Sequence, residues 1–573
     1  MNKKYIYIIW LIIFLIVFPL LKPGYIFSLD QVLNPNGWIT QIGWNIYWVS
    51  LLSQVFTFFH IPIWIMEKLL IIMTFMLPSI GGYLLLRWDS KRNNIHPGIL
   101  FWIFLLLCNP FLYSRFIDGQ VNIYLSYALY PLFFYVLHRY FSHQNWKNIL
   151  YVSLLSLLLC LTSIHNSIFI LFIVVIFSLF HIKKSEYINL WRLWISLLLI
   201  NLIWIVPFAV LKNSSNSIYQ LENFWLDHRT AFQTLAWDTN IYFNTLALNG
   251  YWWEQEWRFK ANTEVNDKWK NVFFILLFIV LIWVFSKIDI KNKKTKLNQY
   301  EKSLLTLWVV SFILALGIWA WGIIWTINEL MFAHFPFYEG MREPQKWIMF
   351  LIIVYAYFGT LWVNAIINKM NTYNIHALTK SLSIIFLVSI PIIYTPATLL
   401  WFFGQISIHH YPTEWSEIKE QLIVSEDNDC RYLQEKKSTQ CYDTLSLPWH
   451  GYTGISFTKK VVLWSIVRYF WDQVLFGDNL EIWDIYTQSN RPESKIIENY
   501  IRSGWILREK GVDIFDGAIP FVRELRWLWI KNIILLKEQD YLFYEYFLEQ
   551  LVVQGILERI DENAMIVLYK IKW

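Results

Sequence analysis

The chain has 573 residues, of which 56% are hydrophobic and 19% aromatic, and this composition excludes a soluble globular protein of that length. The formal net charge of +6 comes from Lys and Arg residues in short clusters between apolar runs, which is typical of topology signals and argues against a nucleic-acid partner. The 34 Trp and 33 Tyr residues suit a protein with two interfaces between lipid and water, so we expect membrane lipids around much of the chain.

The first apolar run covers residues 5–21 and follows Lys3 and Lys4. It is long and lacks a small-residue cleavage site, so we interpret it as a retained anchor and first span rather than a signal peptide. Further apolar runs of spanning character follow along the chain. They cover residues 69–86, 99–111, 121–137, 149–161, 168–180, 194–211, 272–285, 304–324, 347–367 and 382–403. The pattern predicts a polytopic α-helical membrane protein with about 11 transmembrane helices.

Loop charges predict the orientation of these spans, because short cytoplasmic loops hold an excess of Lys and Arg. With the N-terminus in the cytoplasm, every cytoplasmic turn is basic; these turns cover residues 87–92, 138–147, 183–192, 287–302 and 369–380. The opposite loops are longer and richer in aromatic and acidic residues. An odd number of spans then places residues from 405 onward outside the cytoplasm.

Two of the outer segments stand out by composition. Residues 42–65 are aromatic but too mixed in polarity for a span, and we expect an interfacial or re-entrant helix there. The loop of residues 212–270 is aromatic and acidic, and connections of this length are usually functional.

Polar and mixed composition begins near residue 409. Residues 445–447 and 533–536 have the pattern of short buried strands, residues 541–551 that of an amphipathic helix, and residues 564–571 that of a closing strand. We therefore predict two domains: a transmembrane domain of residues 1–404 and a small extracytoplasmic α+β domain of residues 405–573.

The four cysteines fall into two pairs. Cys108 and Cys160 lie in apolar runs, where a thiol behaves as a small hydrophobic group. Cys430 and Cys441 bracket a charged stretch of the polar C-terminal region, and we expect a disulfide between them if that region faces an oxidising compartment.

Ionisable groups at the outer mouth of the helices are the candidates for chemistry, because charge buried there is costly without a function. Asp30 follows the first span. The turn Ser114-Arg-Phe-Ile-Asp-Gly-Gln120 joins the third and fourth spans, and the turn Phe337-Tyr-Glu-Gly-Met-Arg-Glu-Pro-Gln-Lys346 leads into the tenth.

These acidic and basic outer turns, with a trailing outer domain, resemble the GT-C superfamily of membrane glycosyltransferases. The motif Asn109-Pro-Phe-Leu-Tyr113 leading to Asp118-Gly-Gln120, with Arg342-Glu-Pro-Gln-Lys346, resembles bacterial membrane proteins of the YfhO-like group. The C-terminal pieces Leu447-Pro-Trp-His450, Gly511-Val-Asp-Ile514 and Ile566-Val-Leu-Tyr569 are similar to the tail of that group. The likeness extends over most of the chain in layout, although each motif is short.

The resemblance implies transfer of a sugar from a polyprenyl-phosphate donor to an envelope glycan, lipid or polymer at the outer face of the bacterial plasma membrane. An acceptor hydroxyl must lose its proton, so the resemblance implies Asp30 as general base. A phosphate leaving group gathers negative charge, which Arg342, Lys346 and, more weakly, Arg115 suit. Glu343 is expected to pair with Arg342.

Further site residues follow from the same resemblance. Asp118 is a candidate to join Asp30 in holding a divalent metal, Mg²⁺ or Mn²⁺, although the double-acid motif of relatives that use a metal is absent. Gln120 is a candidate to bond a sugar hydroxyl. His165, Trp237 and Asp238 are candidates beside the site.

Each assignment has an ordinary alternative. Asp30 could be a helix-capping or solvated aspartate, and Arg342 and Lys346 could be interfacial side chains reaching for lipid headgroups. For the whole protein, the alternatives are a transporter or flippase of a lipid-linked intermediate and a non-catalytic envelope scaffold.

Overall fold

The structure is a computed structural model that describes residues 3–35, 46–90, 97–212, 232–234, 240–252, 272–289, 294–335, 338, 341, 343–373, 375–424, 442–470, 474–477, 479–482, 485–487, 491–509, 518–538 and 540–572. The chain divides into two compact units. The first, which we call the helical unit, comprises Met1–Lys22, Lys68–Pro207 and Leu221–Ile406. The second, the mixed unit, comprises Pro23–Glu67, Phe208–Gln220 and Ser407–Trp573.

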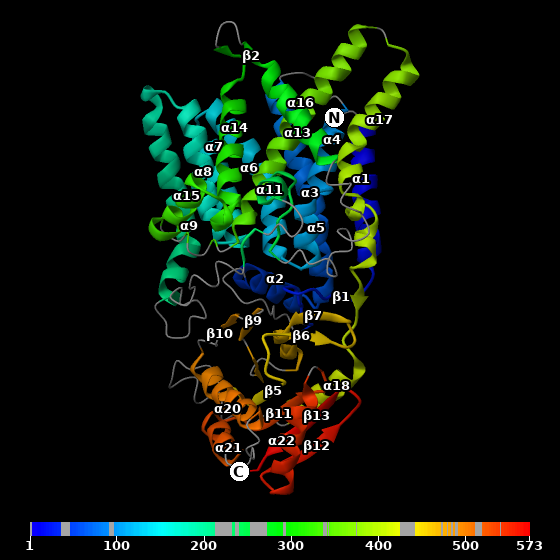
Figure 1. The fold of residues 1–573 in the computed structure, drawn as a ribbon, viewed down its shortest axis with the longest axis vertical. Coiled ribbons are helices and arrows are strands. Elements are labelled where there is room, and N and C mark those ends of the chain that lie inside the picture. Colours follow the sequence, from blue (N-terminus) through cyan, green and yellow to red (C-terminus); the bar gives the residue numbers. More distant parts are fainter. Residues whose placement is uncertain are drawn as a thin grey trace. The chain divides into compact units, whose positions relative to one another are not determined.

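Helices account for nearly all of the described secondary structure in the helical unit (Figure 1). Its α-helices are α1 (Lys3–Val17), α3 (Ile63–Ser90), α4 (Gly98–Leu107), α5 (Pro110–Ile117), α6 (Val121–Ser142), α7 (Trp146–Thr162), α8 (His165–His181), α9 (Tyr187–Lys212), α11 (Ile241–Leu246), α13 (Val272–Ser286), α14 (Gln299–Ala315), α15 (Ile323–His334), α16 (Ile348–Thr372) and α17 (Ala377–Tyr394). Short 3-10 helices are η1 (Phe18–Leu21), η2 (Lys184–Glu186), η5 (Gly317–Trp319), η7 (Pro344–Trp347), η8 (Pro396–Thr398) and η9 (Trp401–Gly404), and the strands β2 (Ile288–Asp289) and β3 (Lys294–Thr295) form a small hairpin.

Several of these helices have the length and composition of membrane spans. Within the described residues, five segments are long and apolar enough to cross a bilayer: Ile63–Trp88, Gly98–Ile117, Tyr187–Pro207, Pro344–Thr372 and Ala377–Tyr394. Four apolar helices are shorter: Tyr7–Leu21, Trp146–Thr162, His165–His181 and Val272–Ser286. The protein is therefore a multi-pass membrane protein, and the predicted number of about eleven spans stays a prediction.

The sequence predicts one span over residues 304–324, but the structure has a break within this run. Helix α14 ends at Ala315, and α15 begins at Ile323. Gly317 has a φ of +62°, a left-handed conformation that favours glycine, and a β-carbon added there would lie 2.2 Å from Gln233 Oε1. The chain therefore turns within an apolar stretch that periodicity alone reads as continuous.

Helix α16 lies at the centre of the helical unit and packs against α4, α13 and α14 (Figure 1). Its residues are buried without interruption from Ile348 to Thr360, as expected of a helix enclosed on all sides. Gly359 allows α4 to approach closely, because an added β-carbon would lie 2.2 Å from the ring of Phe101. The hydroxyl of Thr360 donates to the carbonyl of Gly98 at 3.2 Å, which fixes the same contact.

Asn109 organises the break between α4 and α5. Its Oδ1 accepts from Leu112 N at 2.8 Å and caps α5, while its Nδ2 donates to the carbonyls of Leu105 and Leu106 at 3.0 Å. Nδ2 also lies 3.2 Å from the hydroxyl of Tyr127. One fully buried side chain therefore serves the end of one helix and the start of the next.

We predict that Asn109→Ala lowers the free energy of unfolding by about 2–4 kcal/mol, because it removes an N-cap and leaves buried carbonyls without their donor. Thermal unfolding of the purified protein in detergent measures the effect. The matched control is Asn145→Ala, which removes the exposed N-cap of α7 and should cost about 1 kcal/mol. Equal losses for the two variants would contradict a bridging role for Asn109.

The mixed unit contains the described strands of the C-terminal region (Figure 1). Its strands are β1 (Tyr25–Ile26), β4 (Ile408–His409), β5 (Thr444–Leu447), β6 (Tyr452–Ile455), β7 (Lys460–Leu463), β8 (Val474–Leu475), β9 (Leu480–Ile482), β10 (Ile485–Thr487), β11 (Asn532–Leu536), β12 (Leu557–Glu562) and β13 (Ile566–Ile571). Its helices are α2 (Ile46–Phe58), the first residues of α3, α18 (Thr413–Val424), η10 (Trp464–Tyr469), α20 (Pro492–Glu509), α21 (Ala518–Trp527) and α22 (Tyr541–Val553).

A five-stranded sheet forms the core of the mixed unit, with strand order β12-β13-β11-β5-β8. Strand β11 pairs in parallel with β5 and antiparallel with β13, and every residue of β11 is buried. A strand covered on both faces reads as a continuous apolar run, which is why the sequence predicted it. Strands β5 and β13 and helix α22 likewise confirm the predicted elements at residues 445–447, 564–571 and 541–551.

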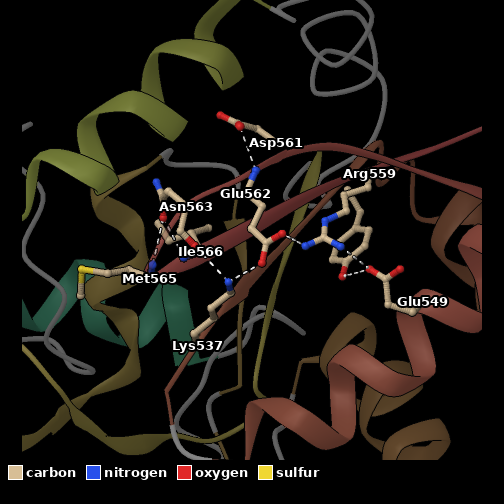
Figure 2. Close-up of polar contacts among 9 residues, drawn as sticks. Lys537, Glu549, Arg559, Asp561, Glu562, Asn563, Met565 and Ile566 are labelled. Carbon is tan, nitrogen blue, oxygen red and sulfur yellow. Dashed lines mark hydrogen bonds and ion pairs between the residues drawn. The ribbon is translucent and has the colours of Figure 1, made fainter.

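Polar contacts join β12, the turn between β12 and β13, and Lys537, which follows β11 (Figure 2). Glu562 accepts from Lys537 Nζ at 2.5 Å and also pairs with Arg559. Asn563 closes the turn between β12 and β13, since its Oδ1 accepts from Met565 N and Ile566 N at 3.0 and 2.9 Å. Because the ion pairs are partly exposed, they contribute little stability.

Candidate functional site

A buried ion pair links two predicted site segments within the helical unit. Arg115, in the last turn of α5, is fully buried, and its Nη1 lies 2.9 Å from Glu343 Oε2. Glu343 is also buried and precedes η7. The two residues stand 228 positions apart in the chain, so the fold brings together turns that the sequence could only propose to be related.

Lys346 completes this group, which we call the Arg115 cluster and define as Arg115, Glu343 and Lys346. Its Nζ lies 3.7 Å from the same carboxylate oxygen of Glu343. Two cations thus share one carboxylate, and the three residues together carry a net positive charge. Lys346 is only 5% exposed, which does not fit the alternative of a side chain extended to lipid headgroups.

Gly119 follows the end of α5 and lets the backbone of Gln120 hydrogen-bond back to Arg115. Gly119 has a φ of +72°, and Gln120 N donates to the carbonyl of Arg115 at 2.9 Å. The side chain of Gln120 then accepts from Arg115 Nη1. Asp118, the C-cap residue of α5, is fully buried in the same turn. The predicted site residues Arg115, Asp118 and Gln120 therefore stand within one tight helix end.

Tyr251 also contacts Arg115 and Gln120, although the sequence did not identify it as a site residue. Its ring centroid lies 4.1 Å from Arg115 Cζ, and its hydroxyl accepts from Gln120 Nε2 at 3.2 Å. Stacking of a guanidinium on an aromatic face holds its plane in one orientation. The aromatic run of residues 251–253 is visible in the sequence, but nothing in the sequence indicates that it contacts Arg115.

Some buried polar atoms of Arg115 and of the neighbouring segment have no hydrogen-bond partner among the described residues. Among the described residues, Arg115 Nε and Nη2 find no hydrogen-bond acceptor, and neither amide atom of Gln345 finds a partner. Gln345 is 1% exposed and stands between Pro344 and Lys346 in η7. Buried polar groups are usually satisfied, so the open donors of Arg115, with Lys346 as a second cation on the same carboxylate, are suited to an anionic ligand.

Asp30 belongs to the mixed unit, in the segment that follows β1. It is half-buried, and its Oδ1 accepts from the hydroxyl of Tyr452 at 3.1 Å. The side chain of Glu67 lies 1% exposed at the start of α3 and accepts from Ile26 N and from Gln31 Nε2. Sequence reasoning missed both Tyr452 and Glu67, because each contact joins residues distant in the chain.

Burial, and then the negative charge of Glu67, raises the pKa of Tyr25 well above its ordinary value, so its phenol stays protonated. Burial also raises the pKa of Tyr411, whose hydroxyl donates to the carbonyl of Leu33 at 3.0 Å. The segment that carries Asp30 is thus bordered by neutral hydroxyl groups at neutral pH.

His165 begins α8, where its Nδ1 lies 3.0 Å from Ser163 Oγ. Cys108 and Cys160 are buried free thiols, as predicted. Five predicted residues lie outside the described residues: Arg342, Trp237, Asp238, Cys430 and Cys441.

The sequence offered a divalent metal held by Asp30 and Asp118 as a candidate. In the described part of the chain, no set of three or more His, Cys, Asp and Glu residues is placed to hold an ion. His450 lies 3.7 Å from Asp540 but forms part of no such set among the described residues. Asp30 belongs to the mixed unit and Asp118 to the helical unit.

Comparison with solved structures finds a similar fold in a mycobacterial arabinofuranosyltransferase, AftD, determined by single-particle cryo-electron microscopy. The match covers 100% of this chain and 42% of that chain, with a TM-score of 0.55 and 10% sequence identity. The chain thus spans less than half the length of that enzyme. At 10% identity the likeness shows a shared fold and nothing further. A scan of protein-family models and a search of curated proteins give no match.

We predict that Glu343→Ala lowers the free energy of unfolding by about 3–5 kcal/mol, because it leaves the buried charge of Arg115 without its carboxylate. Glu343→Gln should cost less, since an amide oxygen still accepts from Arg115. The double variant Arg115→Met with Glu343→Met should regain part of the loss. Thermal unfolding in detergent measures all three.

The matched control is Glu562→Ala, which removes a carboxylate from the partly exposed pairs with Lys537 and Arg559 and should cost about 1 kcal/mol or less. A Glu343→Ala protein as stable as the Glu562→Ala protein would show that Arg115 does not depend on Glu343.

Proposed function

We propose that the protein is a membrane glycosyltransferase that moves a sugar from a polyprenyl-phosphate donor to an envelope glycan, lipid or polymer acceptor. The reaction takes place at the outer face of the bacterial plasma membrane. The observation that carries the proposal is the Arg115 cluster, two buried cations with open donors on Arg115, inside a fold shared with a glycosyltransferase of known structure.

The Arg115 cluster binds the donor phosphate in this proposal. Arg115 Nε and Nη2 form one edge of a planar guanidinium, and that geometry matches two phosphate oxygens. Lys346 adds a second cation, and Arg342 a third. A cation in a buried site stabilises the charge that develops on a departing phosphate far more than it would in water.

Asp30 acts as the general base. The acceptor hydroxyl oxygen forms a bond with the anomeric carbon as the bond from that carbon to the phosphate oxygen breaks. The acceptor proton passes to the Asp30 carboxylate, and polyprenyl phosphate leaves. With a monophosphate donor, the cations of the Arg115 cluster supply the charge neutralisation that Mg²⁺ or Mn²⁺ would otherwise provide.

The remaining predicted residues are assigned to sugar binding, to positioning the cations and to lining the site. Gln120 and Asp118 are proposed to bond sugar hydroxyls, and Glu343 to hold Arg115 and Lys346 in place. His165, Trp237 and Asp238 are proposed to line the site. Because the structural relative is named an arabinofuranosyltransferase, a polyprenyl-phosphate-linked arabinofuranose is the first donor to assay.

The proposal includes the topology expected from loop charges. About eleven spans would place the N-terminus in the cytoplasm and residues from 405 onward outside it, with a disulfide between Cys430 and Cys441 in the oxidising compartment. The basic loops of residues 138–147, 183–192 and 369–380 would then face the cytoplasm.

A transporter or flippase of a lipid-linked intermediate is the second candidate, because a fully buried guanidinium among apolar helices also suits a path for a lipid phosphate. Proteoliposomes separate the two functions. A flippase would move the labelled lipid between leaflets without breaking its sugar–phosphate bond. A protein that does neither would be a scaffold.

We predict that Asp30→Asn lowers transfer by at least about 100-fold, because a positioned general base contributes a factor of this order. The amide still accepts from Tyr452, so the variant should fold. Release of polyprenyl phosphate in proteoliposomes with an envelope-extract acceptor measures transfer. The control is Glu420→Gln, an exposed carboxylate of α18, which should keep full activity. Normal transfer by Asp30→Asn would end the assignment of Asp30.

A further inference from the structure

Asp30 lies in the segment of residues 24–34, which follows the first helices of the chain. Within it, Ser28 N donates to the carbonyl of Gln31 at 3.0 Å. Other elements of the mixed unit also contact this segment and help to position Asp30.

Strand β4 and Glu67 hold the beginning of the segment. Tyr25 and Ile26 pair antiparallel with His409 and Ile408. Gly24 has a φ of +111°, and a β-carbon there would lie 2.7 Å from Ile408 Cγ2, so the close approach requires glycine.

The carboxylate of Glu67 holds the same segment through hydrogen bonds. Its carboxylate accepts from Ile26 N at 3.1 and 3.3 Å and from Gln31 Nε2 at 2.7 Å. These donors lie on either side of Asp30 in the chain. Because Glu67 is almost fully buried, each of these charge-assisted hydrogen bonds is strong.

The hairpin of β6 and β7 holds the residues next to Asp30. Tyr452 and Leu463 face each other as partners in this hairpin. Leu463 N donates to the carbonyl of Leu29 at 3.0 Å, and the hydroxyl of Tyr452 donates to Asp30 Oδ1 at 3.1 Å. A single rung of the hairpin thus fixes the backbone before Asp30 and the carboxylate itself.

Lys460 extends the same contact to a third residue, because its Nζ donates to the carbonyl of Phe27 at 3.2 Å. The ring of Phe27 also packs edge-on against Phe457 in the hairpin turn. The hairpin therefore contacts Phe27, Leu29 and Asp30, and the side chain of Tyr452 reaches the Asp30 carboxylate.

We propose that Tyr452 is the positioning residue of Asp30 and that Glu67 positions the segment that bears it, so the C-terminal hairpin is a working part of the transferase. The inference rests on the proposed role of Asp30 as general base. A carboxylate turns about two side-chain bonds, and a hydrogen bond to one oxygen limits that rotation. Proton transfer requires this restraint, since misplacement by about 1 Å can cost about 100-fold in rate.

The test compares Tyr452→Phe with the natural protein in the transfer assay, using polyprenyl-phosphate-linked arabinofuranose as the donor. We expect kcat to fall about 10- to 100-fold with KM for the donor unchanged, because Tyr452 acts on the base and not on the donor phosphate. Thermal unfolding should change little, since one hydrogen bond contributes about 1 kcal/mol. Tyr546→Phe, which alters an exposed tyrosine of α22, is the matched control and should keep kcat.

Asp30→Asn in the same assay separates the two claims. If Asp30→Asn stays active, the proposed function of Asp30 fails. If Asp30→Asn is inactive and folded Tyr452→Phe keeps the natural kcat, the function stands and the positioning role is overturned. A fall in kcat with an equal rise in KM for the donor would also overturn it, since that pattern indicates that the variant disturbs donor binding as well.

Glu67→Gln keeps the inference testable if Tyr452→Phe does not fold. The amide retains an oxygen that accepts from the segment but loses the charge that strengthens both contacts. We expect a lower kcat with an unchanged KM for the same donor. An unchanged kcat in a folded Glu67→Gln protein would overturn the positioning of the Asp30 segment.

Discussion

A guanidinium removed from water among apolar helices constrains the helical unit more than any other described group. An isolated charge in such surroundings is so costly that it requires a counter-charge. Glu343 supplies it to Arg115, and this contact ties the end of α5 to the start of η7. Lys346 then adds a second cation to the same carboxylate. An arrangement of this kind suits the binding of an anion better than it suits stability, because well-packed apolar residues often stabilise an interior equally well.

The two units contribute different kinds of order to the proposed chemistry. In the helical unit, rigid helix ends carry the charged side chains, with Asn109 and Gly119 setting where α5 begins and ends. In the mixed unit, Asp30 lies on a loop whose position is imposed by Glu67 and by the β6–β7 hairpin. The C-terminal region is therefore more than an appended domain in this account. A loop bearing a general base gains precision when a sheet holds it at several points.

Apolar periodicity predicted the helices well, because a helix that faces lipid or lies among other helices reads as a long apolar run. Strands β5, β11 and β13 were also predictable, since buried strands form short apolar runs. The break at Gly317 was not, because the residues on both sides are apolar and only the φ of one glycine turns the chain. Residues 323–334, which the sequence placed partly in an outer loop, form α15.

The candidate site was predictable in part. Ionisable residues near span ends identified Arg115, Glu343 and Lys346, and the fold joins all three. Their pairing was not predictable, because Arg115 and Glu343 are separated by 228 positions and no local pattern encodes the contact. Tyr251, Glu67 and Tyr452 were missed for the same reason. Arg342, to which the sequence assigned a phosphate contact together with Lys346 and the pairing with Glu343, lies outside the described residues.

The most direct measurement is an experimental structure of the full chain in a lipid nanodisc with a non-transferable polyprenyl-phosphate sugar analogue bound. We expect phosphate oxygens within hydrogen-bond distance of Arg115 and Lys346. A phosphate bound elsewhere, with the guanidinium of Arg115 occupied only by Glu343 and Gln120, would contradict it.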